Sequence, residues 1–298
     1  MCGGSRHQSL GAIPAGDFFA GRVLATAIPG GQLWHCVDCD SLFRHPILTA
    51  AEYRRLYEGG AAEQWSGDET RLDLEAVRSV FLGSPGAKRV LDVGCGSGDF
   101  LASLPATFER FGIEPSSGAA ALAAQRGIRI AAPTLEELPE DARFDVITIV
   151  DVIEHIPDPA PFLGMAIGHL AAGGVVVVST GSPQVPVWRG VYGAHFWYCS
   201  FPEHISFPSR QFYERCARNN GAEVAGVTVT RYRDLPLWKA GVLWLIQLVY
   251  WVSPQLLDWI GRGIDALTRA PAPRRQHFSP GIGGVFSDHW VVAIRRPG

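Results

Sequence analysis

Three glycines alternate with other residues behind an acidic residue in the run VLDVGCGSGD. Asp92 comes first, and Gly94, Gly96 and Gly98 follow it. Glycine lets a backbone turn tightly and approach a ligand that a Cβ would hold away. Glu114 ends the next apolar run, where a carboxylate can accept both hydroxyls of a ribose that carries no phosphate. The residue types and their spacing therefore indicate a nucleoside-binding site.

The same run departs from two phosphate-binding patterns. A nicotinamide dinucleotide site has the pattern Gly-x-Gly-x-x-Gly, and here Asp99 stands where the third glycine would be. The Gly-x-x-x-x-Gly-Lys-Ser/Thr pattern of nucleoside triphosphate sites does not occur in the sequence. The motif thus favours a nucleoside without phosphates. An NAD-dependent oxidoreductase of similar fold stays open as the alternative.

Histidines supply the candidate catalytic bases. His195 and His204 lie in an aromatic segment directly after a buried strand predicted at 175–180, and His155 follows a strand predicted at 144–150. An imidazole near its ordinary pKa is suited to deprotonating a phenol, an enol or a carbon acid. The alternative for His204 is packing against the helix that starts at Ser209. For His155 the alternative is a structural hydrogen bond.

Cysteines near the N-terminus have the spacing of a metal knuckle. Cys36 and Cys39 are separated by two residues, a spacing that lets both thiols bind one tetrahedral metal ion from a tight turn. Cys2 resembles the remainder of a second knuckle, because two glycines follow it. We expect a structural zinc ion with these three ligands and a fourth from His7, His35 or His45, or else a thiol pair without function.

Strands and helices alternate along most of the chain. Apolar runs predict seven strands, at 88–93, 109–114, 128–131, 144–150, 175–180, 223–230 and 289–295. Helical segments separate most of them. Ser116 is placed to cap the helix over 116–126, and Asp158 the helix over 158–170. The alternation predicts an α/β fold with a doubly wound, mostly parallel sheet and helices on both faces. Residues 1–48 are expected to be loop-like.

The motifs LDVGCGSG, GIEPSS, FDVITIVDVIEHIPDP and HLAAGGVVVVST resemble those of the class I S-adenosylmethionine-dependent methyltransferases. The resemblance covers roughly residues 85–230, with a closing strand at DHWVVAIRR, and it implies a seven-stranded, Rossmann-like sheet. The N-terminal cysteines resemble part of a small zinc ribbon found ahead of some methyltransferases.

The resemblance also implies roles for particular residues. The segment from Asp92 to Gly98, with Cys95 inside it, would contact the methionine part of S-adenosylmethionine, and Glu114 the ribose. Thr134 and Leu135 would lie near the adenine, and Asp151 and His155 would border the methyl-transfer site. The family often has an aspartate where this chain has Thr134, so Glu136 or Glu137 is the alternative adenine contact.

We predict two units, a degenerate zinc-knuckle region at 1–60 and a methyltransferase domain at 61–298. Two insertions, at 181–208 and 235–287, interrupt the second unit and are the expected place of acceptor specificity. Residues 235–260 are rich in leucine and tryptophan but are interrupted by polar residues. We expect a buried cap over the active site, and the alternative is a peripheral membrane contact.

The composition excludes several classes of protein. The 298 residues are 47% hydrophobic and carry a net charge of -3 without a basic block, which disfavours disorder and nucleic-acid binding. Six irregularly spaced cysteines and the absence of an apolar leader in the first ten residues favour a cytoplasmic setting, with membrane association as an addition.

The prediction is a methyltransferase acting on a small molecule, either a sugar nucleotide, a glycolipid precursor or a quinone-like acceptor. A catalytically silent cofactor-binding module is a further alternative.

Overall fold

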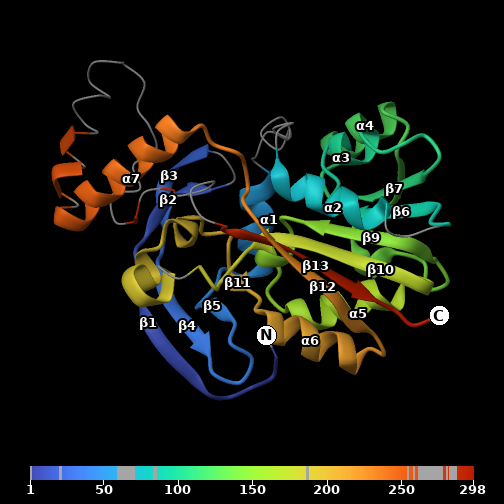
Figure 1. Cartoon of the computed structure of the whole chain (residues 1–298), viewed down its shortest axis with the longest axis horizontal. Coiled ribbons are helices and arrows are strands. Elements are labelled where there is room, and N and C mark those ends of the chain that lie inside the picture. The colour runs from blue at the N-terminus through green and yellow to red at the C-terminus, as the bar shows by residue number, and fades with distance from the viewer. Residues whose placement is uncertain are drawn as a thin grey trace.

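The computed structural model of the chain describes residues 2–19, 22–58, 71–82, 86–185, 188–253, 255–257, 259–260, 278–279, 281 and 287–298. Its largest element is a seven-stranded sheet in the order β12-β13-β10-β9-β6-β7-β8 (Figure 1). The strands are β6 (Arg89–Val93), β7 (Glu109–Ile113), β8 (Arg129–Ala132), β9 (Phe144–Val150), β10 (Leu170–Gly181), β12 (Glu223–Thr230) and β13 (His289–Arg295). Only β13 runs antiparallel to its neighbours in this sheet. The predicted doubly wound, mostly parallel α/β fold is confirmed.

Helices cover both faces of this sheet (Figure 1). On one face lie α2 (Leu72–Leu82), α3 (Asp99–Ala102) and α4 (Ser117–Gln125), and on the other lie α5 (Pro159–Gly168) and α6 (Arg210–Asn219). Successive residues of a strand point to opposite faces. Val90 accordingly packs in the core with Leu101 of α3, whereas Leu91 packs in the core with Phe162 of α5. The apolar runs of β6, β9 and β10 are therefore buried on both sides, as expected of parallel strands.

The N-terminal region contains strands, so the expectation that residues 1–48 are loop-like was wrong. The strands are β1 (His7–Ile13), β2 (Gly16–Phe19), β3 (Arg22–Ile28), β4 (Gly31–Cys36) and β5 (Leu42–His45), and α1 (Ala50–Glu58) follows them. A second sheet has the order β1-β4-β5-β11, and β2 pairs with β3. These strands are short and interrupted by glycines, so the local pattern of the sequence is weak. Their register depends on pairing between distant segments.

The insertion at 181–208 supplies the last strand of this second sheet. In β11 (Ser206–Phe207), Phe207 pairs with Leu42 and Ser206 with Phe43. The short helical turns before it, including Trp188–Tyr192 and Trp197–Ser200, pack their aromatic side chains against the second sheet. The insertion therefore joins the N-terminal region to the seven-stranded sheet. The predicted boundary between residues 60 and 61 lies outside the described residues.

The helix of the second insertion is mostly exposed. In α7 (Leu237–Val252), Gln247 is the buried residue, and its side-chain amide donates a hydrogen bond to the hydroxyl of Tyr192. Leu237 and Trp238 are 91% and 67% exposed. For the described residues of 235–260 the expectation of a buried cap over the active site is wrong, because α7 is mostly exposed and lies beyond the β2-β3 hairpin, at the far end from the seven-stranded sheet (Figure 1). No helix in the described part of the chain combines the length and the apolar character needed to cross a bilayer.

Candidate active site

The glycine motif forms the turn between β6 and α3. Gly94, Gly96 and Gly98 have φ angles of 76°, 54° and 82°, which lie in the left-handed region that residues with a Cβ rarely adopt. A Cβ on Gly94 would lie 2.6 Å from Cγ2 of Val152, whereas a Cβ on Gly96 would meet no heavy atom within 4 Å. The backbone at Gly96 therefore borders open space, which fits the close approach of a ligand.

Glu114 connects the end of β7 to this turn. Its carboxylate accepts the backbone N–H of Gly96 at 2.9 Å and that of Ser116 at 2.8 Å. Burial raises the pKa of Glu114 above its ordinary value, and these two hydrogen bonds oppose the rise. The predicted ribose acceptor thus lies beside the glycine turn, at the carboxyl end of the strand next to β6.

Asp92 is buried under the turn, with 5% of its surface exposed. The hydroxyl of Thr148 donates a hydrogen bond of 2.6 Å to its carboxylate. Burial raises the pKa of Asp92 to about 7, and the nearby charge of Glu114 adds to the rise, while the hydrogen bond from Thr148 lowers it. Two carboxyl groups are therefore held close together at the place where the sequence predicts cofactor binding.

The other predicted cofactor residues are placed in different ways. The side chains of Cys95 and Leu135 are buried in the hydrophobic cores on the two faces of the sheet. Only the backbone of each residue is therefore available to contact a ligand. Thr134 precedes the turn Leu135–Glu137, and its hydroxyl donates a hydrogen bond of 3.1 Å to Glu137. The alternative adenine contacts, Glu136 and Glu137, are exposed.

Asp151 takes part in an ion-pair network that the sequence analysis missed. It follows β9 with a φ of 51°, and its carboxylate lies 2.7 Å from Nη1 of Arg71. Arg71 also donates two hydrogen bonds to Asp73, which in turn accepts the hydroxyl of Ser179 at 2.9 Å. The two carboxylates raise the pKa of the Arg71 guanidinium further above its ordinary range, although its burial opposes them. The guanidinium stacks on the ring of Tyr232 at 4.4 Å. No spacing in the sequence links Arg71 and Asp73 to the other members, because these two lie at the start of α2 and the others come from β10 and from the loops that follow β9 and β12.

His155 and His204 come together in the structure. The centroids of their rings are 5.0 Å apart, although the two residues come from different loops. Nδ1 of His155 lies 3.0 Å from the carbonyl of Glu203, and Nδ1 of His204 lies 3.2 Å from the carbonyl of Tyr198. A carbonyl only accepts, so Nδ1 carries the proton in both rings. Burial lowers the pKa of His155, which keeps that ring neutral near pH 7.

A buried carboxyl group, Glu154, lies beside these histidines and was not predicted. It is 1% exposed, and its Oε1 accepts the hydroxyl of Tyr198 at 2.8 Å. Burial raises the pKa of Glu154 to about 7, and the charge of Asp151 adds to the rise. Its position directly before His155 was the available signal. The third predicted base, His195, ends the turn Gly193–His195, and its side chain is exposed.

Asp158 is the N-cap residue of α5, but its side chain makes no capping hydrogen bond, so that part of the capping prediction was wrong. Ser116 does cap α4, because its hydroxyl accepts the N–H of Ala119 at 3.4 Å.

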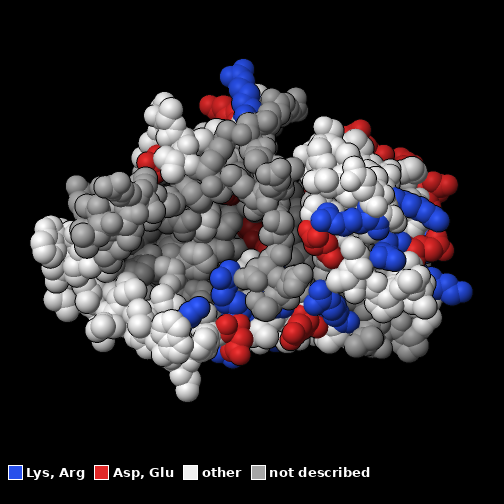
Figure 2. Space-filling view, turned by 90° about the horizontal axis from the view of Figure 1, so that it is seen from above, with Lys and Arg blue, Asp and Glu red and all other residues white. Residues whose placement is uncertain are grey.

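The glycine turn, Glu114 and Asp151 all follow the carboxyl ends of parallel strands, which meet at one edge of the sheet. Figure 2 shows acidic atoms between the end of the molecule that carries α7 and the end that carries this sheet.

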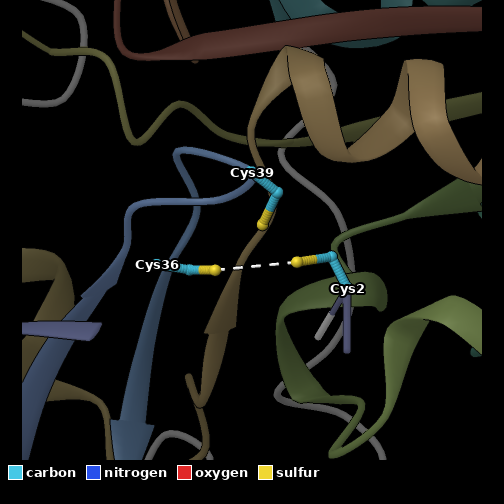
Figure 3. Close-up of side chains that lie close together, drawn as sticks. All are labelled: Cys2, Cys36 and Cys39. Carbon is cyan, nitrogen blue, oxygen red and sulfur yellow. Dashed lines mark hydrogen bonds between the residues drawn. The ribbon is translucent and has the colours of Figure 1, made fainter. Parts of the chain in front are cut away.

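The three predicted metal-ligating cysteines also come together, at the turn after β4 (Figure 3). The sulfur atoms of Cys2, Cys36 and Cys39 all lie within 4.8 Å of one another, and those of Cys2 and Cys36 are 3.6 Å apart. Burial raises the pKa of Cys39 to about 12. Burial also raises the pKa of Cys216, on α6, to about 11, with a contribution from Cys2. Sequence spacing had not linked Cys216 to this cluster.

The predicted fourth ligands are engaged elsewhere or exposed. Nε2 of His35 lies 2.9 Å from the carboxylate of Asp40, and the ring of His7 packs edge-on against Phe43. The side chain of His45 is exposed. Within the described residues, none of these three histidines joins the cysteine cluster.

Comparisons with known proteins agree with this architecture. A family model described as a methyltransferase domain matches residues 68–226, more than half of the chain. Ubiquinone biosynthesis O-methyltransferase of a Bradyrhizobium species is 39% identical over 101 residues, which are 31% of this chain and 39% of that protein. The protein of the same name from Sodalis glossinidius is 33% identical over 136 residues, 42% of this chain and 53% of that one. The chain thus spans about half or less of the length of these curated relatives.

Two solved structures are similar in fold. A SAM-dependent methyltransferase from Thermotoga maritima has a TM-score of 0.47 at 20% identity and covers 83% of this chain and 95% of its own. N-methyltransferase NodS from Bradyrhizobium japonicum, in complex with S-adenosyl-L-homocysteine, has a TM-score of 0.48 at 14% identity and covers 83% of this chain and 98% of its own.

The fold and the glycine turn define a class I, Rossmann-like methyltransferase architecture. The chain belongs to the methyltransferase domain family. The predicted resemblance to the class I methyltransferases is confirmed, and S-adenosylmethionine is the cofactor that the family supports. The open space at Gly96 and the position of Glu114 fit such a cofactor.

Proposed function

We propose that the protein is an S-adenosylmethionine-dependent methyltransferase that methylates a hydroxyl group of a small, quinone-like acceptor. The observation that carries the proposal is the position of Glu114, which lies beside the glycine turn at the carboxyl edge of the sheet. The relatives named ubiquinone biosynthesis O-methyltransferase support a quinone-like acceptor over a sugar nucleotide or a glycolipid precursor.

Different residues of this chain would have different roles in an in-line displacement of the methyl group. S-adenosylmethionine, when bound, supplies an electrophilic methyl group, and the protein supplies alignment and a base. Asp92 and the turn from Gly94 to Gly98 would hold the methionine part, and Glu114 the ribose. The residues bordering the acceptor would be Asp151, His155 and His204. The neutral ring of His155 has a lone pair on Nε2, which can accept the proton of an acceptor hydroxyl, and His204 offers the same atom whenever its ring is unprotonated. His195 is the third candidate base.

Calorimetric titration tests the class of protein. We expect one-to-one binding of S-adenosylmethionine and of its demethylated product, and no binding of NAD. Incubation with a dihydroxylated aromatic acceptor should then give a product heavier by one methyl group in mass spectrometry. Binding of NAD alone would identify an oxidoreductase. Binding of S-adenosylmethionine without transfer to any aromatic acceptor would support the silent module instead.

We further propose that α7 touches a membrane surface, where a lipid-soluble acceptor would be found. Its exposed residues include Trp238, Trp244 and Leu245, and Lys239 is the one charged residue of the helix. At 1.5 Å per residue, its 16 residues extend about 24 Å, which is short of the ~30 Å core of a bilayer. A contact that lies in the interface is therefore the arrangement that suits this helix.

Liposome flotation tests the membrane contact. Leu245 and Leu248 are 62% and 49% exposed, so Leu245→Glu with Leu248→Glu should keep the fold while making insertion of α7 unfavourable. We expect the double variant to lose most of its binding to vesicles. The matched control is Val229→Glu on β12, where Val229 is 60% exposed at the sheet edge. Equal flotation of the wild type and the double variant would contradict the proposal.

The cysteine cluster supports a structural zinc ion as a separate proposal. Three thiols within 4.8 Å of one another form most of a tetrahedral site. Metal analysis of the purified chain should find zinc that Cys36→Ser removes. Cys216→Ser would show whether α6 contributes the fourth ligand, and Cys199→Ser, at a buried cysteine outside the cluster, is the control. Absence of zinc from the wild type after incubation with Zn²⁺ would leave a plain thiol cluster.

A further inference from the structure

His289 is a buried histidine at the site edge of the sheet that was not among the predicted site residues. It begins β13 and pairs with Gly181 at the end of β10. Because β13 runs antiparallel to β10, its first residue lies at the edge where the carboxyl ends of the parallel strands meet. Asp151 lies at the same edge, since its backbone N–H bonds the carbonyl of Ser179 in β10. His289 is therefore placed at the edge of the predicted methyl-transfer site.

Ring contacts connect His289 to two parts of the site. The centroid of its ring lies 4.9 Å from that of Tyr232 in the loop after β12. The ring of Tyr232 stacks on the guanidinium of Arg71, which pairs with Asp151. The ring of Tyr198, from the first insertion, has its centroid 6.4 Å from that of His289. His289 thus lies near both the ion-pair network and the insertion that is expected to set acceptor specificity.

A carboxylate orients the ring of His289. Nδ1 of His289 lies 3.2 Å from Oδ1 of Asp288, and the two side chains are 4% and 3% exposed. The same oxygen accepts the backbone N–H of Tyr232 at 3.0 Å, so the carboxylate is itself held in place. A carboxylate only accepts, so Nδ1 carries the proton, and Nε2 keeps its lone pair when the ring is neutral. No described residue bonds Nε2, which leaves this atom to a ligand.

Asp288 also has an oxygen without a donor. Its Oδ2 is buried and has no hydrogen-bond partner among the described residues. A buried carboxylate oxygen is costly when it is left without a donor. A hydroxyl group of a bound ligand would supply one. The pair therefore offers two proton-accepting atoms, Nε2 and Oδ2, to an acceptor that carries hydroxyl groups.

The surroundings of His289 favour its protonated form. Burial lowers the pKa of His289, but the hydrogen bond and the charge of Asp288 raise it. The charges of Asp151 and Asp73 add to the rise, and the pKa of His289 lies above its ordinary value of 6.5. An imidazolium that forms when the ring takes a proton is therefore stabilised, as a base requires. The other titratable or charged groups that face this ring or its neighbours are Tyr198, Glu154, Arg71 and Tyr232.

We propose that His289, oriented by Asp288, is the base that takes the proton of the acceptor hydroxyl. The inference rests on the proposed function, and it deepens that function by assigning the proton to one histidine. Burial lowers the pKa of His155, which makes that ring the weaker base. His155 and His204 then border the acceptor without taking its proton, and Asp288 is a positioning residue.

The chemical step balances. The acceptor hydroxyl gives its proton to Nε2 of His289, and its oxygen attacks the methyl carbon. The carbon–sulfur bond breaks with its electron pair left on sulfur. The products are the methylated acceptor, S-adenosylhomocysteine and the imidazolium of His289, which then releases the proton to water.

Nuclear magnetic resonance of the histidine rings tests the pair without relying on activity. The full chain is titrated with S-adenosylhomocysteine bound, and the signal of His289 is the one that His289→Gln removes. We expect a pKa above 6.5 for His289 in the wild type. Asp288→Asn keeps an oxygen for the Nδ1 proton but loses the charge, so it should lower that pKa. A wild-type pKa at or below 6.5 would overturn the proposal.

The pH dependence of kcat/KM tests the base, with catechol as the acceptor. Because His289 must be neutral to act, activity should rise with pH through a pKa above 6.5, whereas a base at His155 would give a rise below 6.5. His289→Gln should lower kcat by about 100-fold or more and abolish the rise, and Asp288→Asn should move the rise to lower pH.

The matched control is His169→Gln, which should leave the profile unchanged. Nδ1 of His169 bonds a carbonyl at 3.0 Å, and the residue directly precedes β10, at the opposite edge of the sheet from His289. A rise that persists in His289→Gln would overturn the proposal and return the role of base to His155 or His204.

Binding of S-adenosylmethionine, measured by calorimetry on each variant, reports on the fold and on the class of protein independently of the base. Absence of methyl transfer by the wild type despite that binding would contradict the proposed function, and the assignment of the base with it. Transfer with an unchanged profile in His289→Gln contradicts the assignment of the base alone.

Discussion

The carboxylate of Glu114 holds the glycine turn in place by accepting the backbone N–H of Gly96, with 2.9 Å between Oε2 and the nitrogen. The other carboxylate oxygen accepts the N–H of Ser116 at the start of α4. One side chain thus positions two segments that the sheet brings to the same edge. A ligand that bonds to this carboxylate also contacts a turn that the carboxylate has already ordered.

Replacing Glu114 should weaken cofactor binding. Glu114→Ala removes both hydrogen bonds and the predicted ribose acceptor, so we expect the affinity for S-adenosylmethionine to fall at least tenfold, or about 1.4 kcal/mol. Titration calorimetry measures the change. Glu109→Ala, on the same strand and exposed, is the control and should bind as the wild type does. Unchanged affinity of Glu114→Ala would rule out the ribose assignment.

The turn should not accept a side chain at Gly94. Gly94→Ala combines a positive φ with a contact of 2.6 Å to Val152, and we expect a loss of about 2–4 kcal/mol in the free energy of unfolding. Gly173→Ala has a similar φ of 71° but meets no atom within 4 Å, so it should lose only about 1–2 kcal/mol. Urea unfolding compares the two variants. Adding Val152→Ala should restore part of the loss at Gly94, and no restoration would argue against the contact.

The pH dependence of stability should depend on Asp92. Its pKa is raised from 3.8 to about 7, so between these values the folded chain holds a proton that the unfolded chain has released. The free energy of unfolding therefore falls as the pH rises through this range. Asp92→Asn cannot titrate, so its stability relative to the wild type should increase from about pH 4 to about pH 7.

The measurement for Asp92 is urea unfolding without cofactor at several pH values in that range. Groups that do not interact with Asp92, such as Glu154, contribute to both proteins and cancel in the difference. Parallel stability curves for the wild type and Asp92→Asn would contradict the raised pKa.

The buried arginine should matter far more than a surface arginine. Arg71→Met leaves the carboxylates of Asp73 and Asp151 without their cation, and we expect a loss of about 3–5 kcal/mol in the free energy of unfolding. Arg129, which lies 3.3 Å from Glu109 on the surface, is the matched control. Arg129→Met should change stability by less than about 1 kcal/mol. Similar losses in the free energy of unfolding for both variants would show that burial does not increase the contribution of the Arg71 ion pairs to stability.

Local patterns in the sequence determined the seven-stranded sheet, the glycine turn and the carboxyl end at which Glu114 stands. Each of these depends on neighbours within a few residues, because a buried apolar run and a glycine at positive φ are properties of short segments. The same is true of the spacing of Cys36 and Cys39.

The tertiary structure decided what distant segments do together. It pairs β11 with β5, brings His204 to His155 and Glu154, places Arg71 between Asp73 and Asp151, and leaves α7 exposed. None of these has a signal in local periodicity, because each depends on contacts between residues many positions apart. Burial then changed the chemistry of the groups it enclosed, raising the pKa of Asp92 and of Glu154 to about 7.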